Sequence, residues 1–238
     1  MSAFLNPPRV YSRQEALARP SPVPAAGGVY GWWFRQMPPL VDARDCRRHG
    51  ELRLLYAGIS PRQPPRNGRP SSQQTLRQRV WTHYAGNAEG STLRKTLGCL
   101  LAEELGMQLR RVGSGNRKTF VEGEQALSAW MADNAFVSWV VREHPWELED
   151  RLIAAVDLPL NLEGNSRNRF HQVLTQMRAG CAAQANALPV MPNPGRRTQA
   201  AVVTRQSSAS GNDTRRHLAG AEYGHVAALL SACPGIRP

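Results

Sequence analysis

Two short runs of aromatic and branched residues, 28–34 and 52–59, most strongly constrain how this chain can fold. Glycine, proline and charged residues flank both runs, and this composition predicts two β-strands. The segment between them contains the adjacent prolines Pro38 and Pro39, followed by charged residues at 42–48. We expect a long connection that still allows the two strands to pair.

Helical patterns occupy much of the remaining middle of the chain. Thr75 and Gln78 form a capping box, which predicts a helix that ends at about Tyr84. A leucine stripe predicts a second helix that begins near Ser91 and ends at Leu105. Other patterns predict helices at residues 125–132, 146–156 and 168–179 and strands at residues 108–112, 118–121 and 135–141.

The two ends of the chain differ from the middle in composition. Residues 1–26 are rich in proline, and we expect a lead-in along the surface with a short helix capped by Ser12 and Glu15. Residues 180–238 are rich in Ala, Gly, Ser and Arg and have little periodicity, which predicts a mostly disordered tail. The length of 238 residues suits one domain with such tails.

Charge and targeting signals narrow the function classes. The 30 basic residues exceed the 18 acidic ones, and a formal net charge of +12 favours a polyanionic partner, with nucleic acid first. The alternative is an arginine codon bias, because Lys95 and Lys118 are the only lysines. The four cysteines form no Cys-x-x-Cys pair, which gives a zinc site or disulfide framework little support. Membrane-spanning and secretory patterns are absent, so we expect a cytoplasmic protein without a membrane partner.

Four separated segments resemble the GIY-YIG nuclease family. They are Gly-Val-Tyr at residues 28–30, Tyr-Ala-Gly at 56–58, Leu-Arg-Gln-Arg-Val-Trp-Thr-His-Tyr at 76–84, and a Glu-x-x-Leu-Ile segment at 149–153 with an Asn twelve residues after the Glu. The order of the motifs and the element types both match. A mostly uncharacterised bacterial subgroup is similar also outside these motifs.

The resemblance implies an α/β (α+β) domain at residues 27–179, with a small mixed or antiparallel sheet flanked by helices. Two departures accompany it. Ala57 stands where the family usually has Ile or Val, and Tyr30 and Tyr56 are much farther apart than usual. A further enlargement implies an insertion at about residues 86–134.

The resemblance implies a catalytic face made by Tyr30, Tyr56, Arg79, His83 and Glu149, with Asn161 as a further catalytic residue. Arg79 and His83 are four residues apart and therefore project from one helix face, whereas Arg77 points elsewhere. A guanidinium can grip two phosphate oxygens, so Arg79 is the expected phosphate clamp. Its alternative is a solvated surface cation. His83 could orient a group or relay a proton, or it could be a structural hydrogen bonder.

Glu149 is the expected metal ligand. It shares a helical stripe with Leu152, Ile153 and Val156, so its carboxylate should face inward, whereas Glu147 lies on the other side. An unpaired buried carboxylate is costly, and a bound cation accounts for such a position. Hard oxygen ligands and phosphate favour Mg²⁺, with Mn²⁺ as the second choice. The alternative is a structural ion pair with Arg79.

Tyr30 and Tyr56 are both candidates for the base that activates water, and the choice between them stays open. A tyrosine needs a neighbouring cation, metal or proton acceptor to act as a base near neutral pH. Without the family, both would be ordinary aromatic strand residues. The amide of Asn161 is expected to hold the active-site loop or helix in place.

Arginines outside the motifs are candidates for nucleic-acid binding. Residues 60–72 form a proline-rich loop whose Arg62, Arg66 and Arg69 could follow a phosphate backbone, and Arg77 is a fourth candidate. Solvated cations are the alternative for the loop. The sequence thus predicts a metal-dependent endonuclease acting on nucleic acid, with DNA preferred. The alternatives are an inactive nucleic-acid-binding module of the same fold and a scaffold whose tail binds an acidic protein.

Overall fold

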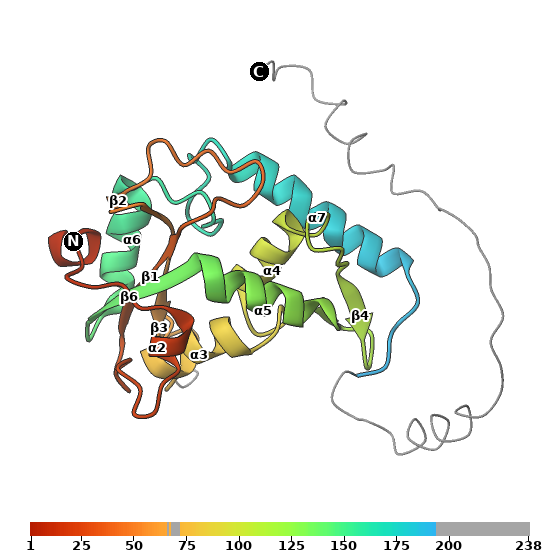
Figure 1. The fold of residues 1–238 in the computed structure, drawn as a ribbon, viewed down its shortest axis with the longest axis horizontal. Helices are drawn as coiled ribbons and strands as arrows, with labels where there is room; N and C mark the ends of the chain where they lie inside the picture. The colour runs from red at the N-terminus through yellow and green to blue at the C-terminus, as the bar shows by residue number, and fades with distance from the viewer. Residues whose placement is uncertain (66, 68–71, 194–238) are drawn as a thin grey trace, which may run out of the picture. The chain divides into compact units, whose positions relative to one another are not determined.

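The computed structural model describes residues 1–193, except 66 and 68–71 (Figure 1). The helices are α1 (Ser2–Leu5), α2 (Arg13–Ala16), α3 (Leu76–Ala85), α4 (Thr92–Leu100), α5 (Gly123–Asn134), α6 (Pro145–Ala155) and α7 (His171–Ala187). The strands are β1 (Gly28–Phe34), β2 (Arg48–His49), β3 (Leu52–Ser60), β4 (Arg110–Val112), β5 (Arg117–Thr119) and β6 (Ala135–Val141). None of the helices in these residues is both long and apolar enough to cross a membrane.

A four-stranded antiparallel sheet with the order β2-β3-β1-β6 forms the centre of the fold. The two predicted strands pair directly as β1 and β3, and the long connection between them returns through the short strand β2. The hairpin β4–β5 forms a separate two-stranded sheet. The predicted α+β fold, with a small sheet flanked by helices, is therefore confirmed.

A β-bulge interrupts the pairing of β1 with β3. Trp32 lies opposite Tyr56, but the next residue, Trp33, lies opposite Leu54, so Leu55 is an extra residue in β3. Strict alternation would place Leu54 and Tyr56 on the same face of the sheet. Tyr56 shares the face of Tyr30 through the regular register from Gly58, and the bulge places Leu54 on the opposite face.

The two faces of the sheet bury separate apolar clusters. Tyr30, Trp32 and Phe34 pack with Val80 and Tyr84 of α3 in the larger cluster. The opposite face packs against α1 and α6, in a cluster of Phe4, Val29, Trp33, Leu52, Leu54, Ala57, Leu148, Leu152 and Leu158. Helix α3 therefore covers the tyrosine face, and α6 lies under the other.

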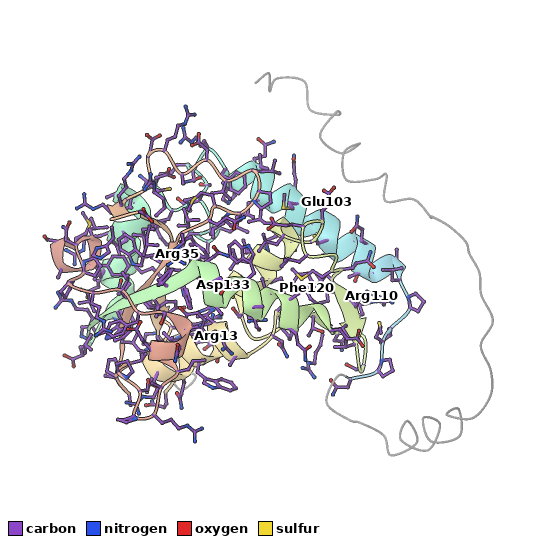
Figure 2. The ribbon with its side chains drawn as sticks, in the orientation of Figure 1. Arg13, Arg35, Glu103, Arg110, Phe120 and Asp133 are labelled. Carbon is purple, nitrogen blue, oxygen red and sulfur yellow. The ribbon has the colours of Figure 1, made fainter. Side chains whose placement is uncertain are left out.

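The segment predicted to be an insertion, residues 86–134, packs around its helix α4. Phe120, labelled in Figure 2, is buried against this helix at Gly98, where an added Cβ would lie 2.0 Å from the Phe120 ring. Glycine is required here because the two elements approach so closely. Helix α7 contacts both α4 and β4, so the insertion and the C-terminal helix stabilise each other.

The folded unit extends beyond residues 27–179 at both ends. Phe4 and Val23 are each 1% exposed, and Tyr11 exchanges two backbone hydrogen bonds with Val137 of β6. Helix α7 continues past Ala179 and buries Ala185 completely. The end of the predicted helix at Ala179 was wrong because the alanine-rich segment resembles a low-complexity tail, although alanine has the highest intrinsic helix propensity. The remainder of the predicted disordered tail, 194–238, lies outside the described residues.

Candidate active site

Tyr30 and His83 form the buried centre of the site. The Tyr30 hydroxyl lies 2.9 Å from His83 Nε2, and His83 Nδ1 lies 2.7 Å from the Ser91 hydroxyl. Burial lowers the pKa of His83 well below its usual value, and the nearby Arg79 and Arg94 cations lower it further. A neutral imidazole donates from one ring nitrogen and accepts at the other, so His83 links the two hydroxyls.

Arg79 contacts the same tyrosine from the next turn of α3. Its Nε donates to the Tyr30 oxygen at 3.3 Å, and its Nη1 donates to the Gly90 carbonyl at 2.9 Å. Burial raises the pKa of Tyr30, and the Arg79 guanidinium opposes this rise. Arg79 is thus a held, half-buried cation rather than a freely solvated one.

Gly58 makes room for the phenol of Tyr30. The two residues are direct cross-strand partners, and a Cβ on Gly58 would lie 2.6 Å from the Tyr30 hydroxyl oxygen. This close approach gives a steric reason for glycine at the third position of the Tyr-Ala-Gly motif. Tyr56 lies beside Tyr30 with 6.4 Å between ring centroids, and burial raises its pKa well above the usual value.

Glu149 lies beside the buried stripe of α6 rather than at its centre. Leu148 and Leu152 are buried, whereas Glu149 is half-buried and Glu147 is exposed. Among the described residues, the Glu149 carboxylate has neither a hydrogen bond nor an ion pair, which excludes the structural pair with Arg79 within this part of the chain. Burial raises its pKa to about 7, and Asp150 adds to the rise.

The Glu149 charge acts on both tyrosines. It raises the pKa of Tyr30 and that of Tyr56, which shows that the carboxylate lies within electrostatic reach of both hydroxyls. Within the described part of the chain, no three His, Cys, Asp or Glu side chains converge as a metal cluster. A metal ion at Glu149 would therefore take most of its ligands from water and phosphate, as Mg²⁺ commonly does.

Asn161 secures the bulged edge of β3. Its side-chain amide donates to the Ala57 carbonyl at 2.7 Å and accepts from the Ala57 N–H at 2.9 Å. The backbone of Leu160 donates to the carbonyl of the bulged residue, Leu55. These bonds occupy the part of the β3 edge that the short strand β2 does not cover. Asn161 therefore positions the segment of β3 that carries Tyr56, and not helix α6.

Ser91 and Arg94 are site residues that motif reasoning did not select. Arg94 is completely buried, pairs with Glu124 at 2.7 Å, and donates to the carbonyls of His83 and Tyr84 at the end of α3. Ser91 caps α4 by accepting from the Arg94 N–H, and the same hydroxyl contacts His83. The N-cap position of Ser91 was visible in the sequence, but its contact with His83 was not.

The four candidate nucleic-acid-binding arginines have different surroundings. Arg62 is exposed, and its charge lowers the pKa of the Glu149 carboxyl, so it lies near that group. Arg77 is exposed, and its Nε donates to the Val23 carbonyl at 2.8 Å. Arg66 and Arg69 lie outside the described residues.

The site thus combines the Arg79 cation with a carboxylate that is unpaired among the described residues and lies near two hydroxyls. A family profile described as the GIY-YIG catalytic domain matches residues 28–180. Because this match spans more than half of the chain, the protein belongs to the GIY-YIG family, and this membership supports a nuclease-type function on nucleic acid. No curated protein and no solved structure matches the chain.

Proposed function

We propose that this protein is an endonuclease that hydrolyses phosphodiester bonds of DNA and depends on a divalent metal ion, Mg²⁺ in preference to Mn²⁺. The observation that carries the proposal is the convergence of Arg79, Tyr30 and Glu149 from three different elements. Arg79 contacts the Tyr30 hydroxyl, and the Glu149 carboxylate acts electrostatically on the same hydroxyl. The formal charge of +12 supports a nucleic-acid substrate.

Glu149 is the residue proposed to hold the metal ion. Its half-buried carboxylate lacks a protein partner among the described residues, and its pKa of about 7 shows that ionisation is disfavoured without a nearby cation. Carboxylate oxygen suits a hard divalent ion. When bound, the ion supplies Lewis-acid stabilisation of phosphate charge.

Tyr30 is proposed as the residue that takes the proton from water. The Arg79 guanidinium favours the phenolate form of Tyr30, and neutral His83 stabilises the same form when its Nε2–H donates to the phenolate oxygen, the phenolic proton having left to solvent. In this tautomer, His83 Nδ1 accepts from the Ser91 hydroxyl. The remaining Arg79 donor capacity can stabilise the charge that develops on the phosphoryl oxygens.

A substrate panel tests this function. Purified protein is incubated with linear duplex DNA, branched DNA, single-stranded DNA and RNA, each with Mg²⁺, with Mn²⁺ and with EDTA. We expect metal-dependent cuts in at least one DNA. Tight DNA binding without cutting in either metal would instead identify an inactive module of the same fold, and cleavage confined to RNA would contradict the DNA assignment.

A further inference from the structure

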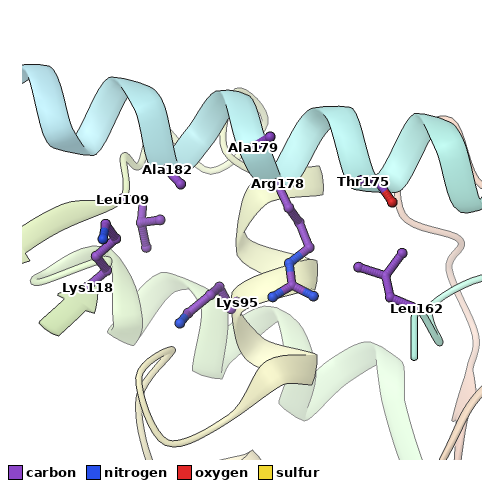
Figure 3. Close-up of a pocket in the computed structure, with 8 residues that line it drawn as sticks. All are labelled: Lys95, Leu109, Lys118, Leu162, Thr175, Arg178, Ala179 and Ala182. Atoms are coloured by element: carbon purple, nitrogen blue, oxygen red, sulfur yellow. The ribbon is translucent and has the colours of Figure 1, made fainter. Parts of the chain in front are cut away.

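A basic pocket outside the candidate active site lies between α4, β5 and α7 (Figure 3). Its volume is about 440 Å³. The residues that line it are Lys95, Leu109, Lys118, Leu162, Thr175, Arg178, Ala179 and Ala182. The only two lysines of the chain are thus in one pocket together with an arginine.

The three cations of this pocket have few protein partners. Figure 3 shows the Arg178 guanidinium reaching from α7 toward Lys95 of α4. Within the described residues, the side chains of Arg178 and Lys118 make no hydrogen bond or ion pair, and Lys95 has only Glu89, with 3.8 Å between Nζ and a carboxylate oxygen. All three cations are half-buried, so an anion placed among them would be screened less than on the open surface.

The pocket is linked to the catalytic face through two short segments. Ser91, which contacts His83, lies four residues before Lys95. Four residues span about 6 Å along a helix axis. Leu162 directly follows Asn161. Glu89, the partner of Lys95, is two residues before Ser91 and next to Gly90, whose carbonyl accepts from Arg79.

We propose that this pocket binds a backbone phosphate of the DNA substrate, a few nucleotides from the bond that is cut. This inference rests on the proposed function. The cations suit phosphate oxygens, and the leucine and alanine walls suit the apolar edge of a deoxyribose. No aromatic side chain lines the pocket to stack on a base, so the contact is to the backbone and independent of sequence.

Binding of the full-length protein to a duplex DNA, measured in EDTA across a salt series, tests this proposal. Arg178→Gln should raise the Kd several-fold and reduce the slope of log K against log salt by about 0.9, the value for one phosphate contact. Lys118→Gln is a second variant in case Arg178→Gln alters folding, which a thermal melt reports. Arg48→Gln is the matched control, because it removes one exposed charge from β2, away from the pocket.

The outcomes separate this inference from the proposed function. Equal Kd values and slopes for Arg178→Gln, Lys118→Gln and Arg48→Gln would overturn the pocket, even if the wild-type protein cuts DNA. Selective weakening by the two pocket variants would support it, even if no cleavage is found. If the pocket binds only small anions, inorganic phosphate should raise the melting temperature of the wild-type protein but not that of the two pocket variants. DNA binding by those variants would then be unchanged, and this result would also overturn the proposal.

Discussion

The Tyr30 hydroxyl lies 2.9 Å from Nε2 of His83, a histidine that burial keeps neutral. The other ring nitrogen is held by Ser91, at the start of α4. Strand β1, helix α3 and helix α4 are therefore joined by one short chain of side chains. Because each group has a defined partner, Tyr30 is better oriented than a solvated surface hydroxyl would be.

Replacing Tyr30 with Phe tests its proposed role as base. Cleavage should fall by at least about 100-fold, the usual contribution of a positioned acid or base. The free energy of unfolding should fall by about 1–3 kcal/mol, because the buried His83 nitrogen loses its partner. Rates come from single-turnover cleavage and stability from urea unfolding. A larger loss of rate in Tyr56→Phe would make Tyr56 the base instead.

Arg79→Ala should damage turnover more than DNA binding, because a clamp on developing charge acts mainly in the transition state. We expect a loss of about 10²–10³-fold in the single-turnover rate at saturating DNA. Arg77→Ala removes an arginine two residues away and should have a milder effect. If Arg79→Ala weakened binding but cut at the wild-type rate at saturation, Arg79 would only dock the substrate.

Glu149→Gln should abolish metal-dependent cleavage while preserving the fold. Glu147→Gln, on the exposed side of the same helix, is the control and should change little. Calorimetric titration with Mg²⁺, together with cleavage assays, reports both effects. Mg²⁺ should raise the melting temperature of the wild-type protein but not that of Glu149→Gln, because a ligand that binds only the folded state stabilises it. Equal loss in both variants would contradict the orientation assigned to α6.

The pKa of Glu149 also predicts a pH dependence in the metal-free protein. The folded-state pKa of about 7 lies above the ordinary value of 4.5, so between these pH values the folded chain retains a proton that the unfolded chain releases. The free energy of unfolding should fall as pH rises through this window. In the Glu149→Gln variant, this fall in the free energy of unfolding should be smaller by up to about 3 kcal/mol. Solvent screening of the half-buried carboxylate reduces the difference. Urea unfolding in EDTA at pH 5 and pH 8 measures the difference.

Gly58→Ala should displace Tyr30, because the added Cβ would lie 2.6 Å from its hydroxyl oxygen. We expect a stability loss of about 1–3 kcal/mol from overpacking, and a lower cleavage rate. Gly180→Ala is the matched control. It lies in α7 with no atom within 4 Å of the added Cβ, so it should raise stability by up to about 1 kcal/mol. Wild-type cleavage by Gly58→Ala would show that the phenol position is unimportant.

Truncation locates the end of the folded unit. A chain ending at Asn193 should keep its melting temperature and bind DNA with a shallower salt dependence, because residues 194–238 carry six arginines against two acidic residues. A chain ending at Ala179 should melt at least about 5 °C lower. It loses buried Ala185 and the carbonyls of Ala185 and Leu188, which accept hydrogen bonds from Arg111. Equal melting temperatures for the two truncated chains would place the end of the folded unit at Ala179.

Much of the secondary structure could be predicted because its signals are local. The Thr75–Gln78 capping box is present at the start of α3, and the apolar run at 135–141 is β6. Helix α4 ends at Leu100, before the predicted Leu105, and turns continue the chain. The short helix α1 and strand β2 were missed, because elements of two to four residues have no periodicity of their own and form through tertiary contacts.

The sequence alone determined the family, the order of the main elements and the identities of Tyr30, Arg79 and Glu149 as candidates, since motifs and caps depend on near neighbours in the chain. Only the tertiary structure decided which of these side chains meet. The register of β1 with β3 places Tyr56 opposite Trp32 on the face of Tyr30, and Ser91 reaches His83 from the next helix. Both outcomes depend on the register and packing of segments distant in sequence, which local patterns do not encode.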